Sequence, residues 1–213
     1  MIKRKEMFFA LGFIASFVLW TVLVGVIDVK SIGPNASKVG FSSLNKAIKE
    51  LIGAHLVLYA ITDWLGLVPI GVALGFAVLG LCQWIKRKSV LKVDTDILIL
   101  GCFYIVVFFT YVLFEYLVIN YRPILINGYL EASYPSSTTM LVTCVMPTSV
   151  MQINRRVNNT IVKRSLNLLI LLFTVFMVVG RLLSGVHWLS DIIGGLLFSI
   201  GIVLFYHWLV NLK

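Results

Sequence analysis

Arg181, His187 and Asp191 lie close together near the C-terminus, and their side chains are of the types that handle phosphate. A guanidinium can hold a phosphate through two parallel hydrogen bonds. A histidine can attack phosphorus or transfer a proton at neutral pH. Asp191 follows His187 by about one helical turn, so its carboxylate can fix the tautomer of the imidazole. The three residues separate two long apolar segments, where charged side chains are costly and indicate function.

The elements that must position these residues are membrane helices. The chain is 60% hydrophobic and only 13% charged, whereas about a quarter of the residues of a soluble domain are charged. We therefore predict an all-α integral membrane bundle, with residues 1–213 forming a single domain. Pro69, between Gly66 and Gly71, predicts that part of 51–66 lies at the interface before the second crossing proper. The six predicted transmembrane helices are 7–27, 56–85, 96–119, 136–153, 165–184 and 190–210.

The basic residues indicate how the bundle is oriented. A net charge of +9 could suggest nucleic acid, but these residues cluster at the ends of apolar segments, which is typical of orientation signals and contacts with anionic lipid. We therefore expect a lipid bilayer, and no nucleic acid, as partner. Both termini are predicted to be cytoplasmic, since 12 of the 18 Lys and Arg then lie inside: Lys3, Arg4, Lys5, Lys86, Arg87, Lys88, Lys92, Arg155, Arg156, Lys163, Arg164 and Lys213.

This orientation brings three polar clusters to the outer face. Arg122-Pro123 follows the third segment, Pro135-Ser136-Ser137-Thr138 opens the fourth, and residues 181–191 connect the fifth and sixth. A helix that begins with proline and serine has free N–H groups at its positive end, where anions bind. The predicted phosphate ligands are Arg122, Arg181, Ser136, Ser137 and Thr138.

The outer loop 28–55 contains a turn signal at Gly33-Pro34 and then apolar residues at near-helical spacing. We expect an amphipathic helix near 39–55 that lies on the outer surface. It could act as a lid, and packing at the interface is the favoured alternative. The apolar positions are Val39, Leu44, Ile48, Leu51 and Ile52.

The three polar clusters resemble the signature of the type 2 phosphatidic acid phosphatase (PAP2) family over nearly the whole chain. The third family motif is matched by Gly180-Arg181-Leu-Leu-Ser-Gly-Val-His187-Trp-Leu-Ser-Asp191, and the first ends in Arg122-Pro123. The resemblance implies that His187 is a nucleophile that forms a phosphohistidine, that Asp191 orients it, and that Arg122, Arg181 and Ser136 with neighbouring amides hold the phosphate. It also implies lipid phosphates or diphosphates as substrates at the outer leaflet, with no metal or other cofactor.

Two positions depart from the family pattern. The family's lysine falls on Glu115, and its second histidine, which protonates the leaving oxygen, falls on Thr138. General acid catalysis contributes roughly 10²–10⁴ in rate. An alkoxide leaving group needs that proton far more than a phosphate does, because the second pKa of a phosphate is only about 6. We therefore predict a preference for lipid diphosphates, such as a polyprenyl diphosphate, over monoesters.

Glu115 has two open interpretations. It lies about two turns before Arg122, so the two side chains share a face if the helix continues. Glu115 is then either a protonated carboxyl that replaces the missing catalytic acid or a structural partner of Arg122 or Arg181, and the structural role is favoured.

Two further functions compete with the phosphatase. A catalytically weakened relative that binds or moves a phosphorylated lipid would explain both departures. A transporter or channel fits less well, because the charges cluster at one face rather than at the midplane. The chain's compactness favours a bacterial cytoplasmic membrane, while an outward-facing Asn35-Ala36-Ser37 sequon leaves a eukaryotic origin open. The lipid identity and the oligomeric state are left open.

Overall fold

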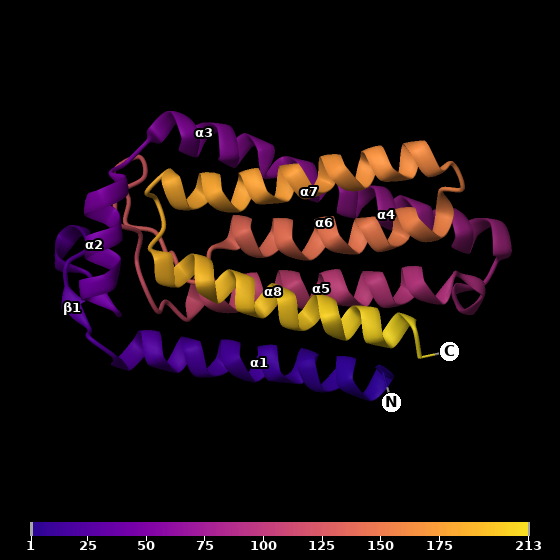
Figure 1. The fold of residues 1–213 in the computed structure, drawn as a ribbon, viewed down its shortest axis with the longest axis horizontal. Helices are drawn as coiled ribbons and strands as arrows, with labels where there is room; N and C mark the ends of the chain where they lie inside the picture. The colour runs from indigo at the N-terminus through magenta and orange to yellow at the C-terminus, as the bar shows by residue number, and fades with distance from the viewer. Residues whose placement is uncertain (1, 213) are drawn as a thin grey trace.

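The computed structural model describes residues 2–212, with side chains from Arg4 onward. Met1 and Lys213 lie outside the described residues. Both belong to the predicted domain, and Lys213 is also one of the 12 basic residues counted as cytoplasmic. The long helices lie side by side in one bundle; α2 and β1 lie across one end, and both chain ends are at the other (Figure 1). The elements are α1 (Ile2–Val26), β1 (Lys30–Ser31), η1 (Pro34–Ala36), β2 (Lys38–Val39), α2 (Ser42–Ile52), α3 (Leu56–Leu65), α4 (Leu67–Arg87), η2 (Val90–Lys92), α5 (Thr95–Tyr116), α6 (Ser137–Arg156), α7 (Thr160–Leu183) and α8 (Leu189–Val210).

Within the described residues, five helical segments are long and apolar enough to cross a membrane, one fewer than predicted. The chain is therefore a multi-pass membrane protein. The helix that does not qualify is α6, which packs against α4, α5, α7 and α8. Because these neighbours cover it, α6 tolerates many serines and threonines, whose hydroxyls donate to the helix's own carbonyls, as Thr148 does to Cys144 at 2.9 Å. The five segments are Arg4–Val26, Leu56–Arg87, Thr95–Tyr116, Thr160–Leu183 and Leu189–Val210.

The second of these segments is divided at Gly66, where α3 meets α4. Gly66 keeps helical angles (φ −60°, ψ −18°), so the chain bends without leaving the helical region. Pro69 lies in the first turn of α4, where its missing N–H costs no helical hydrogen bond. α3 packs along α7, and this places its polar residues beside the end of α7 that carries Arg181.

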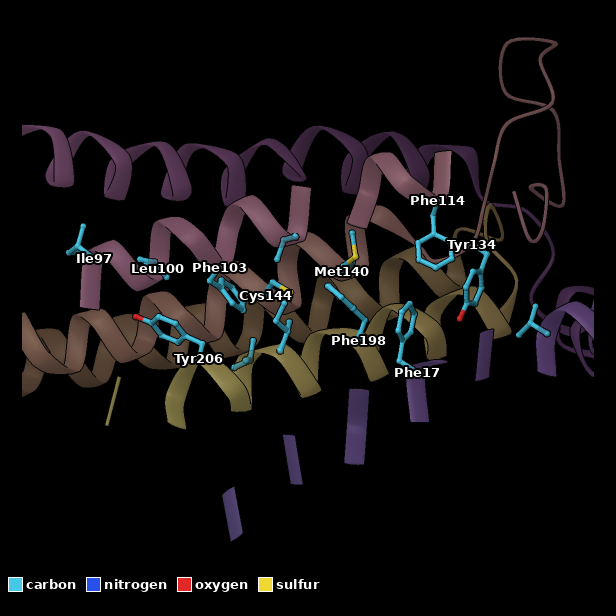
Figure 2. Packing of buried hydrophobic residues seen from close by; sticks show 14 of the residues in the cluster. Phe17, Ile97, Leu100, Phe103, Phe114, Tyr134, Met140, Cys144, Phe198 and Tyr206 are labelled. Atoms are coloured by element: carbon cyan, nitrogen blue, oxygen red, sulfur yellow. The ribbon is translucent and has the colours of Figure 1, made fainter. Parts of the chain in front are cut away.

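An aromatic cluster anchors the loop that leads into α6. The ring of Tyr134 lies 5.6 Å from Phe114 and 6.5 Å from Phe17, and its hydroxyl is 2.7 Å from Thr21 Oγ1. Figure 2 shows these rings gathered at one end of the buried core. Gly194 leaves room for the Tyr134 ring, since a Cβ at this position would come within 2.5 Å of it. The packing of Tyr134 therefore holds the neighbouring loop residues in place.

The predicted surface helix is α2, and its polar side faces the bundle. Asn45 donates to Ser190 Oγ at 2.9 Å, and the Lys49 ammonium donates to the carbonyl of Gly185 at 2.6 Å. Leu44 and Leu51 of the predicted apolar face point outward and are 45% and 81% exposed. Polar contacts therefore attach α2 to the α7–α8 connection. Leu44 and Leu51 are left for the surroundings, while Ile48 and Ile52 are partly buried.

Candidate active site

The helix ends bring Arg181, His187 and Asp191 together. Arg181 lies in the last turn of α7, Asp191 in the first turn of α8, and His187 in the short loop between them. All three side chains are buried. Gly185 allows this tight connection, because its φ is +66° and a Cβ there would lie 2.0 Å from the carbonyl oxygen of Gly53.

The contacts of His187 determine its tautomer. Its Nε2 lies 3.2 Å from Nη2 of Arg181, which can only donate, so Nε2 must accept. Its Nδ1 lies 3.2 Å from the carbonyl oxygen of Ser133, which can only accept, and 3.0 Å from the Ser133 hydroxyl. The proton therefore resides on Nδ1, and the lone pair of Nε2 points to the arginine.

The surroundings of His187 also favour the neutral ring. Burial, followed by the positive charges of Arg122 and Arg181, lowers the pKa of His187 well below its usual value of 6.5. The imidazole is therefore uncharged at neutral pH, and its Nε2 carries the lone pair that accepts from Arg181.

Asp191 does not contact His187 directly, because its Oδ2 lies 4.0 Å from His187 Nδ1. The carboxylate instead accepts from the Ser133 hydroxyl at 2.5 Å, from the Trp188 backbone at 3.0 Å and from Asn120 Nδ2 at 3.0 Å. The sequence analysis missed Ser133 and Asn120. Their one signal in the sequence was position, because Asn120 and Ser133 lie within three residues of the motifs that begin at Arg122 and Pro135.

Arg122 and Arg181 converge on the ring of Tyr59, which belongs to α3. Their guanidinium carbons lie 5.9 Å and 5.1 Å from the ring centroid. Arg122 Nε is 3.1 Å from Glu131, and Arg181 Nη1 is 3.5 Å from Asp63. The carboxylate of Asp63 is more than half exposed, so it neutralises the buried Arg181 only weakly.

The two guanidiniums retain hydrogen-bonding capacity. Among the described residues, Arg122 Nη1 and Arg181 Nε are buried and have no hydrogen-bond partner. Buried donors without partners are costly, and two such cations beside one ring repel each other. A dianion bound by both guanidiniums would satisfy both demands, so the pair is suited to a phosphate. Within residues 2–212, no three His, Cys, Asp or Glu side chains gather as a metal ion would require.

A cleft lies at the start of α6, and His187 is one of the residues that line it. This shallow cleft is partly open to solvent and is lined by Ser133 and Ser137, among others. Ser136 is turned away, since its hydroxyl donates to Thr139 Oγ1 at 3.0 Å and its N–H donates to the Asp191 carbonyl at 3.1 Å. The methyl group of Thr138 lies beside Gly66. Of the three predicted ligands on α6, Ser137 lines the cleft.

Glu115 lies on the wall of the same cleft. The expectation that it shares a helical face with Arg122 is wrong, because α5 ends at Tyr116 and not at 119. The chain leaves the helix there, and the Arg122 N–H pairs with the carbonyl of Glu131 at 3.0 Å. The favoured structural role of Glu115 is also wrong, since Glu131 pairs with Arg122 and Asp63 with Arg181.

A second cleft reaches His187 from the side of α2. It is also partly open to solvent, and its lining includes Asn45, Lys49, Gly185 and Trp188. Partial burial lowers the pKa of Lys49 from its usual value of 10.5. The nucleophile candidate therefore lies between a cleft at the start of α6 and a cleft beneath α2.

Comparison with known proteins agrees with this arrangement. A family model described as the PAP2 superfamily matches residues 103–213, which include every predicted site residue. Among solved structures, the chain is similar to one described as the first transmembrane PAP2 type phosphatidylglycerolphosphate phosphatase from Bacillus subtilis. The two share 20% sequence identity and a TM-score of 0.56, with 93% of each chain covered, and at this identity the likeness shows the fold alone. The chain has no match among curated proteins.

Proposed function

The chain belongs to the PAP2 superfamily, and on that premise we propose that it is a membrane lipid phosphatase with His187 as nucleophile. One observation carries the proposal: the Nε2 of a neutral, buried His187 lies beside the guanidinium of Arg181, and two guanidiniums there have unpaired N–H donors. Such an array of fixed donors stabilises a phosphoryl group as negative charge develops on it.

The substrate phosphate would take its contacts from both arginines and from α6. Its oxygens would accept from Arg122 Nη1 and Arg181 Nε, and from the free amides in the first turn of α6, beside Ser137. The same oxygens would draw Arg181 away from His187 Nε2, and the lone pair of Nε2 would then be free to reach phosphorus.

The reaction proceeds in two displacements. In the first, the lone pair of His187 Nε2 forms a bond to phosphorus while the bond from phosphorus to the leaving oxygen breaks, and that oxygen keeps the electron pair. Nδ1 retains its proton throughout. In the second, water attacks phosphorus, the N–P bond breaks, and the electron pair returns to Nε2. The proton of the water leaves with inorganic phosphate or solvent.

The preferred substrate would be a lipid diphosphate such as a polyprenyl diphosphate. Thr138 stands where the family has its acid, and a threonine hydroxyl does not protonate an alkoxide at neutral pH. A phosphate leaving group needs little help of this kind, because it is far less basic than an alkoxide.

We further propose six crossings, with α6 as the fourth, both termini cytoplasmic, and the site facing outward from a bacterial cytoplasmic membrane. The charge pattern supports this topology, as does the position of both chain ends at one end of the bundle and of α2 at the other (Figure 1). A substrate phosphate in the outer leaflet would then lie level with the site.

A second candidate function is binding or moving a phosphorylated lipid without hydrolysis. This binding function is favoured because Thr138 replaces the family's catalytic acid, whereas Arg122 and Arg181 would still hold the phosphate.

An assay of the purified protein in detergent separates the two functions. We would offer a panel of lipid phosphates and diphosphates to the wild type, to His187→Ala and to the control His207→Ala. His207 is a suitable control because it lies in the last turn of α8, where it contacts Glu6 of α1 and Asn211, at the other end of α8 from the site loop. Phosphate release that persists in the control and disappears in His187→Ala supports the phosphatase. Tight binding of a lipid phosphate by the wild type without phosphate release contradicts the phosphatase. Faster turnover of phosphatidate than of the polyprenyl diphosphate contradicts the proposed preference for diphosphates.

Glu115→Gln tests whether the cleft carboxyl replaces the missing acid. If Glu115 protonates the leaving oxygen, we expect kcat for a lipid monophosphate to fall about 10²-fold, while kcat for the diphosphate changes less than about 3-fold. Circular dichroism and the melting temperature provide the control for folding. An equal loss on both substrates would show that Glu115 does not act as the acid.

A further inference from the structure

The hydroxyl group of Ser133 lies between His187 and Asp191. Its oxygen is 3.0 Å from His187 Nδ1 and 2.5 Å from Asp191 Oδ2, whereas these two atoms are themselves 4.0 Å apart. All three side chains are at most 4% exposed, so bulk water does not bridge them. The carboxylate and the imidazole therefore communicate through this hydroxyl.

The available protons set the direction of the two hydrogen bonds. A serine hydroxyl has one proton to donate, and an ionised carboxylate can only accept. Asp191 accepts N–H groups from Trp188 and Asn120 as well, which is the environment of an ionised carboxylate. The Ser133 proton therefore points to Asp191. The Nδ1 proton of His187 is shared between the Ser133 hydroxyl oxygen at 3.0 Å and the Ser133 carbonyl oxygen at 3.2 Å, and the hydroxyl is the nearer acceptor.

We propose that Ser133 is the positioning residue through which the negative charge of Asp191 acts on His187. The inference rests on the proposed phosphatase function for its kinetic consequence. As Nε2 bonds to phosphorus, the ring becomes positively charged while Nδ1 keeps its proton. The Ser133 hydroxyl, polarised by Asp191, stabilises that charge and holds the ring in line for attack. No proton leaves Ser133 at any step.

The loop around Ser133 is built to hold this position. The Ser133 backbone N–H donates to the carbonyl of Asn120 at 2.9 Å, and the side chain of Asn120 donates to Asp191 at 3.0 Å. The adjacent Tyr134 is 1% exposed and packs into the aromatic core. The hydroxyl is therefore fixed before substrate binds, as a group that stabilises a transition state should be.

A double-mutant cycle tests the inference. Turnover of a short-chain polyprenyl diphosphate in detergent would be measured for Ser133→Ala, Asp191→Asn and the double variant. Ser199→Ala serves as the control, because Ser199 is an equally buried serine that contacts Gly195 and Met140 of the bundle. We expect Ser133→Ala to lower kcat about 10²-fold with KM changed less than about 3-fold. The double variant should be no more than about 3-fold slower than Asp191→Asn, because the charge acts through the hydroxyl.

Two outcomes overturn the inference: the single effects multiply in the double variant, or Ser133→Ala keeps more than about a third of the wild-type kcat. If Ser133→Ala fails to fold by size-exclusion chromatography, Ser133→Cys replaces it, since a thiol fills the same space but is a weak donor and acceptor. Ser133→Thr, which keeps the hydroxyl, should recover activity relative to either variant.

A second readout does not depend on turnover. The chain has 3 histidines, so ¹⁵N-histidine labelling with His187→Gln for assignment identifies the ring of interest. We expect the wild type to carry its proton on Nδ1, and the resonance of that proton to move upfield in both Ser133→Ala and Asp191→Asn. A proton on Nε2, or no response to Asp191→Asn, overturns the relay. An intact Nδ1 signal in a protein without activity would instead count against the proposed function alone.

Discussion

At the scale of single residues, the site combines a neutral imidazole with two buried cations. Burial, followed by the positive charges of Arg122 and Arg181, disfavours the charged form of His187, and the same two cations also offer donors to a phosphate. One arrangement of charge therefore suits both the proposed nucleophile and the proposed phosphate site.

This coupling predicts the pH dependence of catalysis. Because the pKa of His187 is lowered, the free enzyme keeps its nucleophile neutral down to well below pH 6.5, and kcat/KM loses activity in acid only below that value. Arg122→Gln removes one positive charge, which raises the pKa of His187 and should move the acid limb to higher pH. Comparing pH–rate profiles of both proteins on one substrate cancels the ionisation of the substrate itself. An acid limb that stays in place, or moves to lower pH, would contradict the electrostatic account.

The sequence predicted those site residues that are close together along the chain. The grouping of Arg181, His187 and Asp191 follows from helical spacing and from the cost of charge between apolar segments. Ser133 could not be found this way, because its contacts with His187 and Asp191 join residues 54 and 58 positions apart. The loop that carries it has no periodicity from which such contacts follow.

At the scale of elements, α2 and the α2–α3 connection hold the loop that carries His187. Lys49 donates to the carbonyls of Gly185 and Gly53 at 2.6 Å and 3.0 Å, and the His55 N–H donates to the Ser184 carbonyl at 3.0 Å. These bonds satisfy loop carbonyls that would otherwise be poorly solvated.

Lys49→Met tests this role of α2. Removal of the ammonium leaves the carbonyls of Gly185 and Gly53 without their donor, so we expect kcat to fall about tenfold and the melting temperature to fall by roughly 2–4 °C. Lys46→Met is the matched control, one turn earlier on α2, because Lys46 is exposed and makes a weak 3.8 Å contact with Glu50. If both variants behave alike, α2 does not support the loop.

Apolar runs predicted the helices well and their ends less well. The third segment was expected to reach 119, since Leu117, Val118 and Ile119 are apolar. The helix ends at Tyr116 because the chain turns so that Asn120 reaches Asp191 and Gly40. Tertiary hydrogen bonds of this kind override local preference, and hydropathy carries no sign of them.

At the scale of the whole molecule, the bundle encloses a helix whose composition would not by itself indicate a membrane crossing. α6 has buried side chains from Thr139 to Gln152, and its neighbours shield the polar groups of this stretch from lipid. The sequence analysis predicted a span at 136–153, whereas apolarity marks five segments in the described part of the chain and α6 is not among them.

The proposed topology makes a prediction for intact cells. Lys38, near α2, and Lys88, at the opposite end of the bundle, are both exposed, so a single cysteine at either position can react with a thiol reagent. In a background without the native cysteines, we expect a membrane-impermeant reagent to label Lys38→Cys from outside. It should label Lys88→Cys only after permeabilisation. Labelling in the reverse pattern would place the site on the cytoplasmic side.

The most direct test of the account is to trap the covalent intermediate. The protein would be mixed with a polyprenyl diphosphate labelled in its terminal phosphate, quenched in alkali within milliseconds, and mapped by mass spectrometry. We predict acid-labile phosphate on His187 in the wild type and in the control His207→Ala, and none in His187→Ala. Phosphate release without any label on His187, or label on a different residue, would contradict the central claim.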